Sequence, residues 1–239
     1  MTTTDVEAFQ EWGRHFRHLY YEVMSRLGEG RGDRHDGRHG ALVQFIGASP
    51  GCGVSSVARM FALAAASLGD GAVFLFDLAG PENAQHAWFR DLAARTPGRD
   101  LVPIDGALLP TKGLWVDDAG GRTHLRGHWV DGLRLAVSEC RDLDPPPGLD
   151  LRGQAAFWDQ LRAGFDLVVV DAPASSGVFD GILLAGHMDG VVLVVEAEET
   201  RAPVAAHLRD ELEEAGAAIL GAVLNKRRFH IPKFLYRWL

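Results

Sequence analysis

The sequence predicts an α/β domain with a doubly wound, mostly parallel sheet and helices on both faces. Three observations support this prediction. An apolar run leads through a Gly-rich loop into a helix at residues 42–58, a second apolar run ends in Asp171, and apolar runs alternate with helical segments from residue 165 onward. Short apolar strands that alternate with helices are typical of a parallel sheet that is covered on both sides.

The Gly-rich loop has the form of a phosphate-binding loop (P-loop). Residues 47–56 read G-A-S-P-G-C-G-V-S-S and follow the apolar run at 42–46. In such a loop, successive backbone amides and the N-terminus of the next helix form a nest for phosphate oxygens. The sequence departs twice from the pattern G-x-x-x-x-G-K-[ST], because Ala48 holds the first glycine position and Val54 holds the lysine position.

The missing lysine is the more serious departure. That ammonium normally neutralises charge on the β- and γ-phosphates during transfer, and a valine offers neither charge nor a hydrogen bond. The lysines of the chain, Lys112, Lys226 and Lys233, lie far from the loop in sequence, whereas Arg59 is close enough to lean back. We interpret the loop as a phosphate-binding loop that lacks its catalytic cation. It either still binds nucleotide or is a retained strand–loop–helix connection that binds nothing.

Two strand-ending acids accompany the loop. Asp77 ends a predicted strand at 72–77, and Asp171 ends one at 165–171. Doubly wound sheets bind ligands at the carboxyl ends of their strands. Asn225, directly after a predicted strand at 218–224, is either a ligand contact or a turn residue. The candidate contacts of ATP or ADP are Ser49, Gly51, Cys52, Gly53, Val54, Ser55, Ser56 and Asn225; Ser55, Asp77 and Asp171 are the candidate Mg²⁺ ligands, and the two acids are also the residual catalytic candidates.

Composition limits the functional classes. The chain has 239 residues, 47% of them hydrophobic, which is enough for one substantial core. The formal net charge of -8 argues against nucleic-acid binding over the whole surface. Two cysteines do not make a disulfide framework. No signal peptide opens the sequence and no apolar run reaches ~20 residues, so we expect a cytoplasmic protein without a membrane span.

Residues 1–40 are predicted to form an amphipathic helix at 5–27 and a flexible linker at 28–40, ahead of the P-loop domain at 41–239. Within the helix, Glu11, Arg14 and Arg17 recur every three residues beside the apolar face. They form either the solvated side of a docked helix or a surface that pairs with a second subunit through arginine–carboxylate contacts.

Two other segments have less certain roles. The linker holds His35 and His39 beside Asp33 and Asp36, a combination that suggests metal binding, although a flexible polar linker is the favoured interpretation. Residues 101–147 are interpreted as a variable excursion, with a short strand at 133–137, that is either a partner surface or an irregular loop.

The C-terminal tail reverses the charge of the protein. Residues 226–239 contain five basic and seven large apolar side chains and no acid. Such a segment suits an anionic membrane surface or an acidic groove of a partner. The alternative is a helix packed onto the domain.

Together these motifs resemble the cytoplasmic domain of bacterial tyrosine autokinases of exopolysaccharide and capsule synthesis, within the deviant-Walker P-loop group that includes the Min and Par ATPases. Residues 50–55 are similar to the family's Pro-x-x-Gly-Lys-Ser loop, and residues 168–173 to its apolar strand ending in Asp-x-x-Pro, with the proline one residue early. Residues 75–81 are similar to its Asp-x-Asp-x-Arg-x-Pro motif. Glu11, Arg14 and Arg17 match its Glu-x-x-Arg-x-x-Arg assembly motif.

The departures from the family fall on the chemistry. Val54, Leu75 and Ala79 replace its lysine, first Asp and Arg, and its C-terminal tyrosine cluster is reduced to Tyr236. The resemblance implies a pseudokinase or adaptor at the inner membrane periphery. It also implies a homo-oligomer and, as partner, a membrane polysaccharide co-polymerase (chain-length determinant). An active tyrosine kinase or ATPase with an unorthodox cation, and a Min/Par-like positioning ATPase, are the alternatives.

Overall fold

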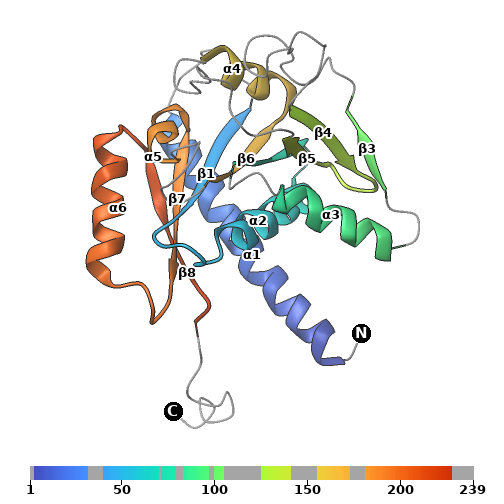
Figure 1. The fold of residues 1–239 in the computed structure, drawn as a ribbon, viewed down its shortest axis with the longest axis horizontal. Coiled ribbons are helices and arrows are strands. Elements are labelled where there is room, and N and C mark those ends of the chain that lie inside the picture. Colours follow the sequence, from blue (N-terminus) through green and yellow to red (C-terminus); the bar gives the residue numbers. More distant parts are fainter. Residues whose placement is uncertain are drawn as a thin grey trace.

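The computed structural model describes residues 3–31, 40–69, 71–78, 83–96, 100–104, 125–140, 155–172 and 181–227. In this part of the chain, eight strands form one sheet in the order β3-β4-β5-β2-β6-β1-β7-β8 (Figure 1). The strands are β1 (Ala41–Gly47), β2 (Val73–Asp77), β3 (Leu101–Pro103), β4 (Leu125–Val130), β5 (Leu135–Cys140), β6 (Leu167–Ala172), β7 (Gly190–Glu196) and β8 (Ile219–Asn225).

The sheet is doubly wound and mostly parallel, as the sequence predicts. All pairs from β5 through β8 are parallel, whereas β3–β4 and β4–β5 are antiparallel. The helices are α1 (Thr3–Arg31), α2 (Val54–Leu68), α3 (Ala84–Arg95), α4 (Ala155–Gly164), α5 (Gly181–Leu184) and α6 (Ala202–Glu214), with the 3₁₀ helix η2 (Ala185–His187) after α5.

Helices cover both faces of the sheet. Successive strand residues point to opposite faces, and both sets are mostly apolar, so both faces must be buried. In β1, Val43 and Phe45 pack with the side chains of α1, α2 and α3, whereas Leu42 and Ile46 pack with those of α4, α5 and α6. β2 and β6 follow the same alternation. The central strands are therefore apolar along most of their length, with Gln44 inside β1 and the acids Asp77 and Asp171 near the carboxyl ends of β2 and β6.

The predicted linker boundary is wrong by one helical turn. α1 continues to Arg31, so residues 28–31 are helical and only residues 32–39 of the predicted linker lie outside the described part. Val23 and Leu27 are buried against the sheet, and this packing holds the helix up to its last turn. A glycine in an exposed helix position costs only about 1 kcal/mol, which the docked face can offset.

The excursion at 101–147 is partly regular. β4 and β5 form an antiparallel hairpin whose connection includes Gly132, with φ of 73°, a left-handed conformation that glycine adopts freely. The strand predicted at 133–137 is displaced to Leu135–Cys140, and β3 and β4 were not predicted. The hairpin adds to the β2 edge of the parallel sheet and extends it.

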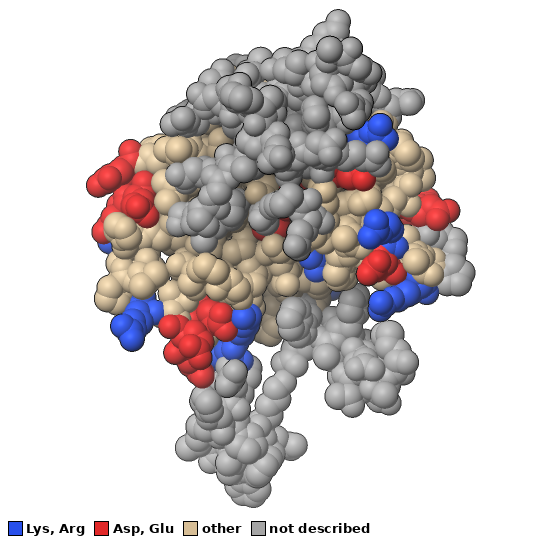
Figure 2. Space-filling model, in the orientation of Figure 1, with Lys and Arg blue, Asp and Glu red and all other residues tan. Residues whose placement is uncertain are grey.

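Within the described residues, no helix has the length and apolar character needed to cross a bilayer. On the face drawn in Figure 2, acidic and basic side chains of the described residues lie interspersed rather than gathered into one basic surface.

Candidate nucleotide-binding site

The P-loop connects β1 to α2 and depends on two glycines. Gly51 and Gly53 have φ values of 79° and 90°, which L side chains rarely adopt. A Cβ on Gly53 would also lie 2.3 Å from Nδ2 of Asn225. Because the first amides of a helix have no partner within it, the start of α2 presents donors suited to an anion.

The side chain in the lysine position contacts the core. Val54 is partly buried and packs against the apolar cluster beneath α1, α2 and α3. A Cβ on Gly47 would lie 2.5 Å from both Val54 Cγ2 and Cys52 Sγ, so these two side chains fill the space against the end of β1. The valine thus packs between the loop and the core, and it offers no positive charge to a phosphate in the loop.

Asn225 is the last residue of β8, and its amide is tied to the loop. Nδ2 donates a hydrogen bond to the carbonyl of Cys52 at 2.8 Å. Ser49 lies on the other side, with Oγ 3.3 Å from Oγ1 of Thr200. These contacts hold the loop against the ends of β7 and β8.

Lys226 lies at the loop although 175 residues separate it from Gly51. Its Nζ donates to the carbonyl of Gly51 at 2.7 Å and to both carboxylate oxygens of Glu196 at 3.0 and 3.1 Å. Sequence reasoning offered Arg59, and not Lys226, as a possible cation for this loop. One feature of the sequence could have pointed to Lys226: it directly follows Asn225, which was already a candidate contact of the nucleotide.

The two acids lie side by side, because Asp77 and Asp171 are register partners in the β2–β6 pair. Both are buried. Gln85, which sequence reasoning also missed, joins them: its backbone amide donates to Asp77 Oδ2 at 2.9 Å, and its Nε2 donates to Asp171 Oδ2 at 2.7 Å. Nε2 also donates to the carbonyl of Ser55 at 2.9 Å, and Oε1 accepts from Arg59 Nε at 2.7 Å.

Burial and the neighbouring acid raise the pKa of Asp171 to about 6. Loss of hydration is the larger cause, and the charge of Asp77 adds to it. Hydrogen bonds from Gln85 and Ser55 and the charge of Arg59 act in the opposite direction but do not cancel these effects. Asp171 therefore gains a proton in a pH range in which ordinary carboxylates remain ionised.

Arg59 leans toward α3 and the acids. Its guanidinium lies 4.6 Å from the ring centroid of Trp88, within cation–π range, and hydrogen-bonds Gln85. Burial lowers its pKa, whereas the charges of Asp171 and Asp77 act to raise it. The cation that the sequence placed near the loop is thus engaged with α3 and the acids.

The acids fit a magnesium ion by their chemistry. Mg²⁺ prefers oxygen ligands, which Ser55, Asp77 and Asp171 would supply at the foot of the loop. Asp171 Oδ1 is buried and has no hydrogen-bond partner among the described residues, so one oxygen is available to a cation. The amide of Gln85, however, already binds the other oxygen and the carbonyl of Ser55.

The remaining motif residues lie partly inside and partly outside the described part of the chain. Leu75 is buried in the core beneath α1, α2 and α3. Ala79 and Pro173 lie outside the described residues. Arg14 and Arg17 are exposed on α1, but the side chain of Glu11 is not among those described.

No protein-family model matches the chain. Among curated proteins, it is 32% identical over 97 residues to the tyrosine-protein kinase CpsD of Streptococcus agalactiae, a match that covers 39% of this chain and 42% of CpsD. It is 33% identical over 72 residues to the putative tyrosine-protein kinase CapB of Staphylococcus aureus, covering 30% and 32% of the two chains. The chain thus spans less than half the length of these relatives.

Solved structures extend the likeness to most of the fold. The chimerical protein CapA2B2 superposes with a TM-score of 0.62 at 21% identity, covering 90% of this chain and 84% of that one. A nucleotide-binding protein of Archaeoglobus fulgidus, solved in complex with ADP, gives a TM-score of 0.53 at 19% identity, covering 89% and 74%. These findings agree with the resemblance drawn from the motifs: over the matched segment the chain is similar in sequence to these tyrosine-protein kinases, and its α/β fold is that of the two solved structures.

Proposed function

We propose that the protein is a non-catalytic, tyrosine-autokinase-like adaptor in bacterial exopolysaccharide or capsule synthesis and export. The observation that carries the proposal is the state of the phosphate site. The residue in the lysine position, Val54, is partly buried and packs against the core, and the amide of Gln85 binds Asp171 and the carbonyl of Ser55. The loop keeps Gly51 and Gly53 in left-handed conformations, whereas the lysine of the motif is absent.

The expected catalytic loss is large. Removing a phosphate-stabilising cation costs on the order of 10³-fold or more in comparable transfer sites. Incubation of the full chain with labelled ATP and Mg²⁺ should therefore leave Tyr20, Tyr21 and Tyr236 unmodified. Tyr21 is 57% exposed and is the most informative acceptor among the described tyrosines. Robust tyrosine labelling that disappears in Asp171→Asn would overturn the proposal.

An active kinase or ATPase with an unorthodox cation is the second candidate, and Lys226 is the observation that favours it. Its Nζ lies 2.7 Å from a carbonyl of the loop, and rotation about its side-chain bonds could carry it from Glu196 to a phosphate. Calorimetric titration with ATP and Mg²⁺ separates the two candidates. The second requires binding that weakens markedly in Lys226→Ala and survives in the exposed control Arg209→Ala.

We expect Val54→Lys to raise the affinity for ATP. A charge-assisted hydrogen bond to phosphate contributes ~1.5–3 kcal/mol, which is roughly a 10- to 150-fold decrease in Kd. The flexible lysine stem can leave the core while its ammonium reaches the loop. Calorimetry would compare it with Val54→Met, which adds length without charge. No gain in a folded Val54→Lys variant would mean that the loop does not hold a phosphate-binding geometry.

We also propose that the chain assembles with copies of itself through α1. Arg14 and Arg17 are exposed on one side of that helix, and arginine binds carboxylates in bidentate geometry. The double variant Arg14→Glu/Arg17→Glu should shift an oligomer toward monomer in light scattering. The matched control is Arg90→Glu/Arg95→Glu, the same charge change on exposed positions of α3. An equal mass for both double variants would assign the α1 stripe to ordinary solvent exposure.

The proposed membrane partner is a polysaccharide co-polymerase, with the chain held at the cytoplasmic side of the inner membrane. Residues 228–239 of the basic tail lie outside the described part, and they remain the proposed contact with anionic lipid or an acidic groove. Lys226 is engaged at the loop, so the proposed docking segment begins after it.

A further inference from the structure

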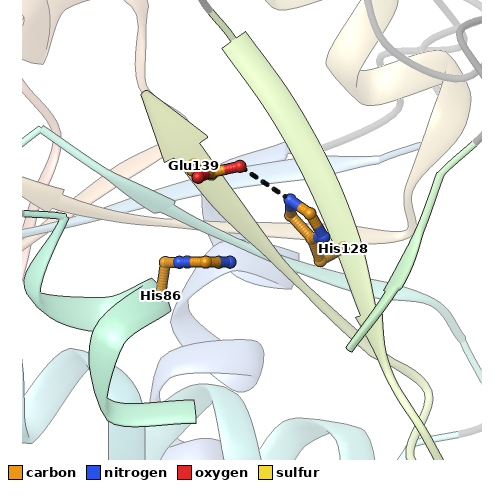
Figure 3. Close-up of side chains that lie close together, drawn as sticks. All are labelled: His86, His128 and Glu139. Carbon is orange, nitrogen blue, oxygen red and sulfur yellow. Dashed lines mark hydrogen bonds and ion pairs between the residues drawn. The ribbon is translucent and has the colours of Figure 1, made fainter. Parts of the chain in front are cut away.

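Three potential metal ligands converge between α3 and the β4–β5 hairpin, apart from the nucleotide site. They are His86 on α3, His128 on β4 and Glu139 on β5 (Figure 3). We propose that they form a site for a divalent transition-metal ion, with Zn²⁺ as its representative. The ion would fasten the first turn of α3 to the hairpin.

The sheet register explains why these side chains meet. His128 is paired with Val137 across the hairpin, so Glu139, two residues further along β5, is its diagonal neighbour on the same face. Val137 packs with the cluster under α1, α2 and α3, so this is the face on which α3 lies. His86, in the first turn of α3, points toward the pair in Figure 3.

The distances suit one ion. One ligand atom from each residue can be chosen so that all three lie within 4.8 Å of one another. His128 Nε2 is 3.0 Å from Glu139 Oε2, and the rings of His86 and His128 are 4.8 Å apart. Ligands of tetrahedral zinc at bond lengths near 2.0–2.1 Å are separated by about 3.4 Å, so small side-chain rotations would complete the set. The fourth position would then be taken by water.

The nitrogen and oxygen ligands of this cluster favour a transition metal. Two imidazoles and one carboxylate are the ligands of many zinc and non-haem iron sites, whereas Mg²⁺ and Ca²⁺ take oxygen ligands. The side chains of His128 and Glu139 are only 12% and 15% exposed. A carboxylate so placed benefits from a cation, and with two neutral imidazoles it would reduce the charge of a divalent ion to +1.

The site adjoins the nucleotide corner through the chain itself. His86 follows Gln85, whose side chain binds Asp171, and Glu139 follows Ser138, whose Oγ accepts a hydrogen bond from the amide of Asp77 at 2.8 Å. A metal ion that joins His86 to Glu139 would therefore also hold Gln85 against the acids. It would stabilise the arrangement in which Gln85 binds one oxygen of Asp171.

The test uses the full chain without a polyhistidine tag. After chelation and dialysis, we expect calorimetry to give one equivalent of Zn²⁺ bound, and Zn²⁺ to raise the midpoint of thermal unfolding. His86→Ala, His128→Ala and Glu139→Gln should each weaken binding by roughly 100-fold or more, because even residues that only support a metal ligand change affinity 10- to 100-fold. Circular dichroism without metal would verify that each variant is folded.

Two control variants separate this site from other histidines. His207→Ala removes an exposed histidine whose Nε2 lies 3.5 Å from Glu211, and His35→Ala/His39→Ala removes the pair in the predicted linker. Both should keep the affinity and the thermal shift. The proposal is overturned if the wild-type chain binds no Zn²⁺, or if binding is lost in either control and retained in the folded His86 and His128 variants.

Discussion

Replacing Asp189 by alanine should lower the free energy of unfolding by about 3–5 kcal/mol, because the variant leaves a buried guanidinium without its counter-charge. Asp189 Oδ2 accepts hydrogen bonds from Arg162 Nη1 and from the backbone amide of Leu42, the latter at 2.7 Å. Arg162 has a side chain only 5% exposed and also donates to the carbonyls of Gly40 and His187. One ion pair therefore joins α4, the start of β1 and the turn before β7.

Chemical denaturation of three variants would measure this effect. For a domain of this size, the expected loss corresponds to roughly 6–20 °C in the unfolding midpoint. Asp189→Asn keeps an oxygen for the amide of Leu42 and should fall between the wild type and Asp189→Ala. Glu213→Ala, which removes one of the two acidic partners of the exposed Arg209, should leave stability unchanged. Equal stability of Asp189→Ala and Glu213→Ala would show that the buried pair contributes no more than a surface contact.

Replacing Asp171 by asparagine should stabilise the protein at neutral pH by about 3 kcal/mol. The pKa of Asp171 is raised from 3.8 to about 6, a shift of about two units at 1.36 kcal/mol each. Between these two pH values, the folded state binds a proton that the unfolded state has released. The stability of the wild type, measured relative to the variant, therefore falls as pH rises from about 4 to about 6 and stays low above that.

The measurement is the free energy of unfolding of both proteins at several pH values from 4 to 8. The two curves should approach each other toward pH 4, where Asp171 is neutral in the folded state and about half protonated in the unfolded state, and separate with rising pH in favour of the variant. Asp100→Asn, at an exposed position, should run parallel to the wild type. A constant offset between wild type and Asp171→Asn at all pH values would contradict the raised pKa.

The parallel sheet could be predicted from the sequence because its signals are local. The run at 190–196 is strand β7 with the predicted bounds, and the run at 165–171 became β6 with a shift of one or two residues. Each central strand is apolar on both faces, so its burial does not depend on knowing its neighbours. Val54 could likewise be identified by its place in a contiguous loop pattern.

The hairpin at β4–β5 and the last turn of α1 were predicted poorly for the opposite reason. The residues of the hairpin alternate only weakly in polarity, and their strand character comes from pairing with β2 through β5. Residues 28–31 carry two glycines, and their helical state follows from the docked Leu27 rather than from propensity.

The chemistry around the loop was decided by tertiary structure. Lys226 meets Gly51 because the order β1-β7-β8 brings the end of β8 to the P-loop, and Gln85 meets Asp171 because α3 begins over the β2–β6 pair. Neither contact has a spacing in the sequence by which it could be recognised. What the sequence determined by itself is the parallel part of the sheet, the loop and the loss of its lysine, since these depend on neighbouring residues. Which side chains surround the acids depends on strand order and register, which only the packed sheet sets.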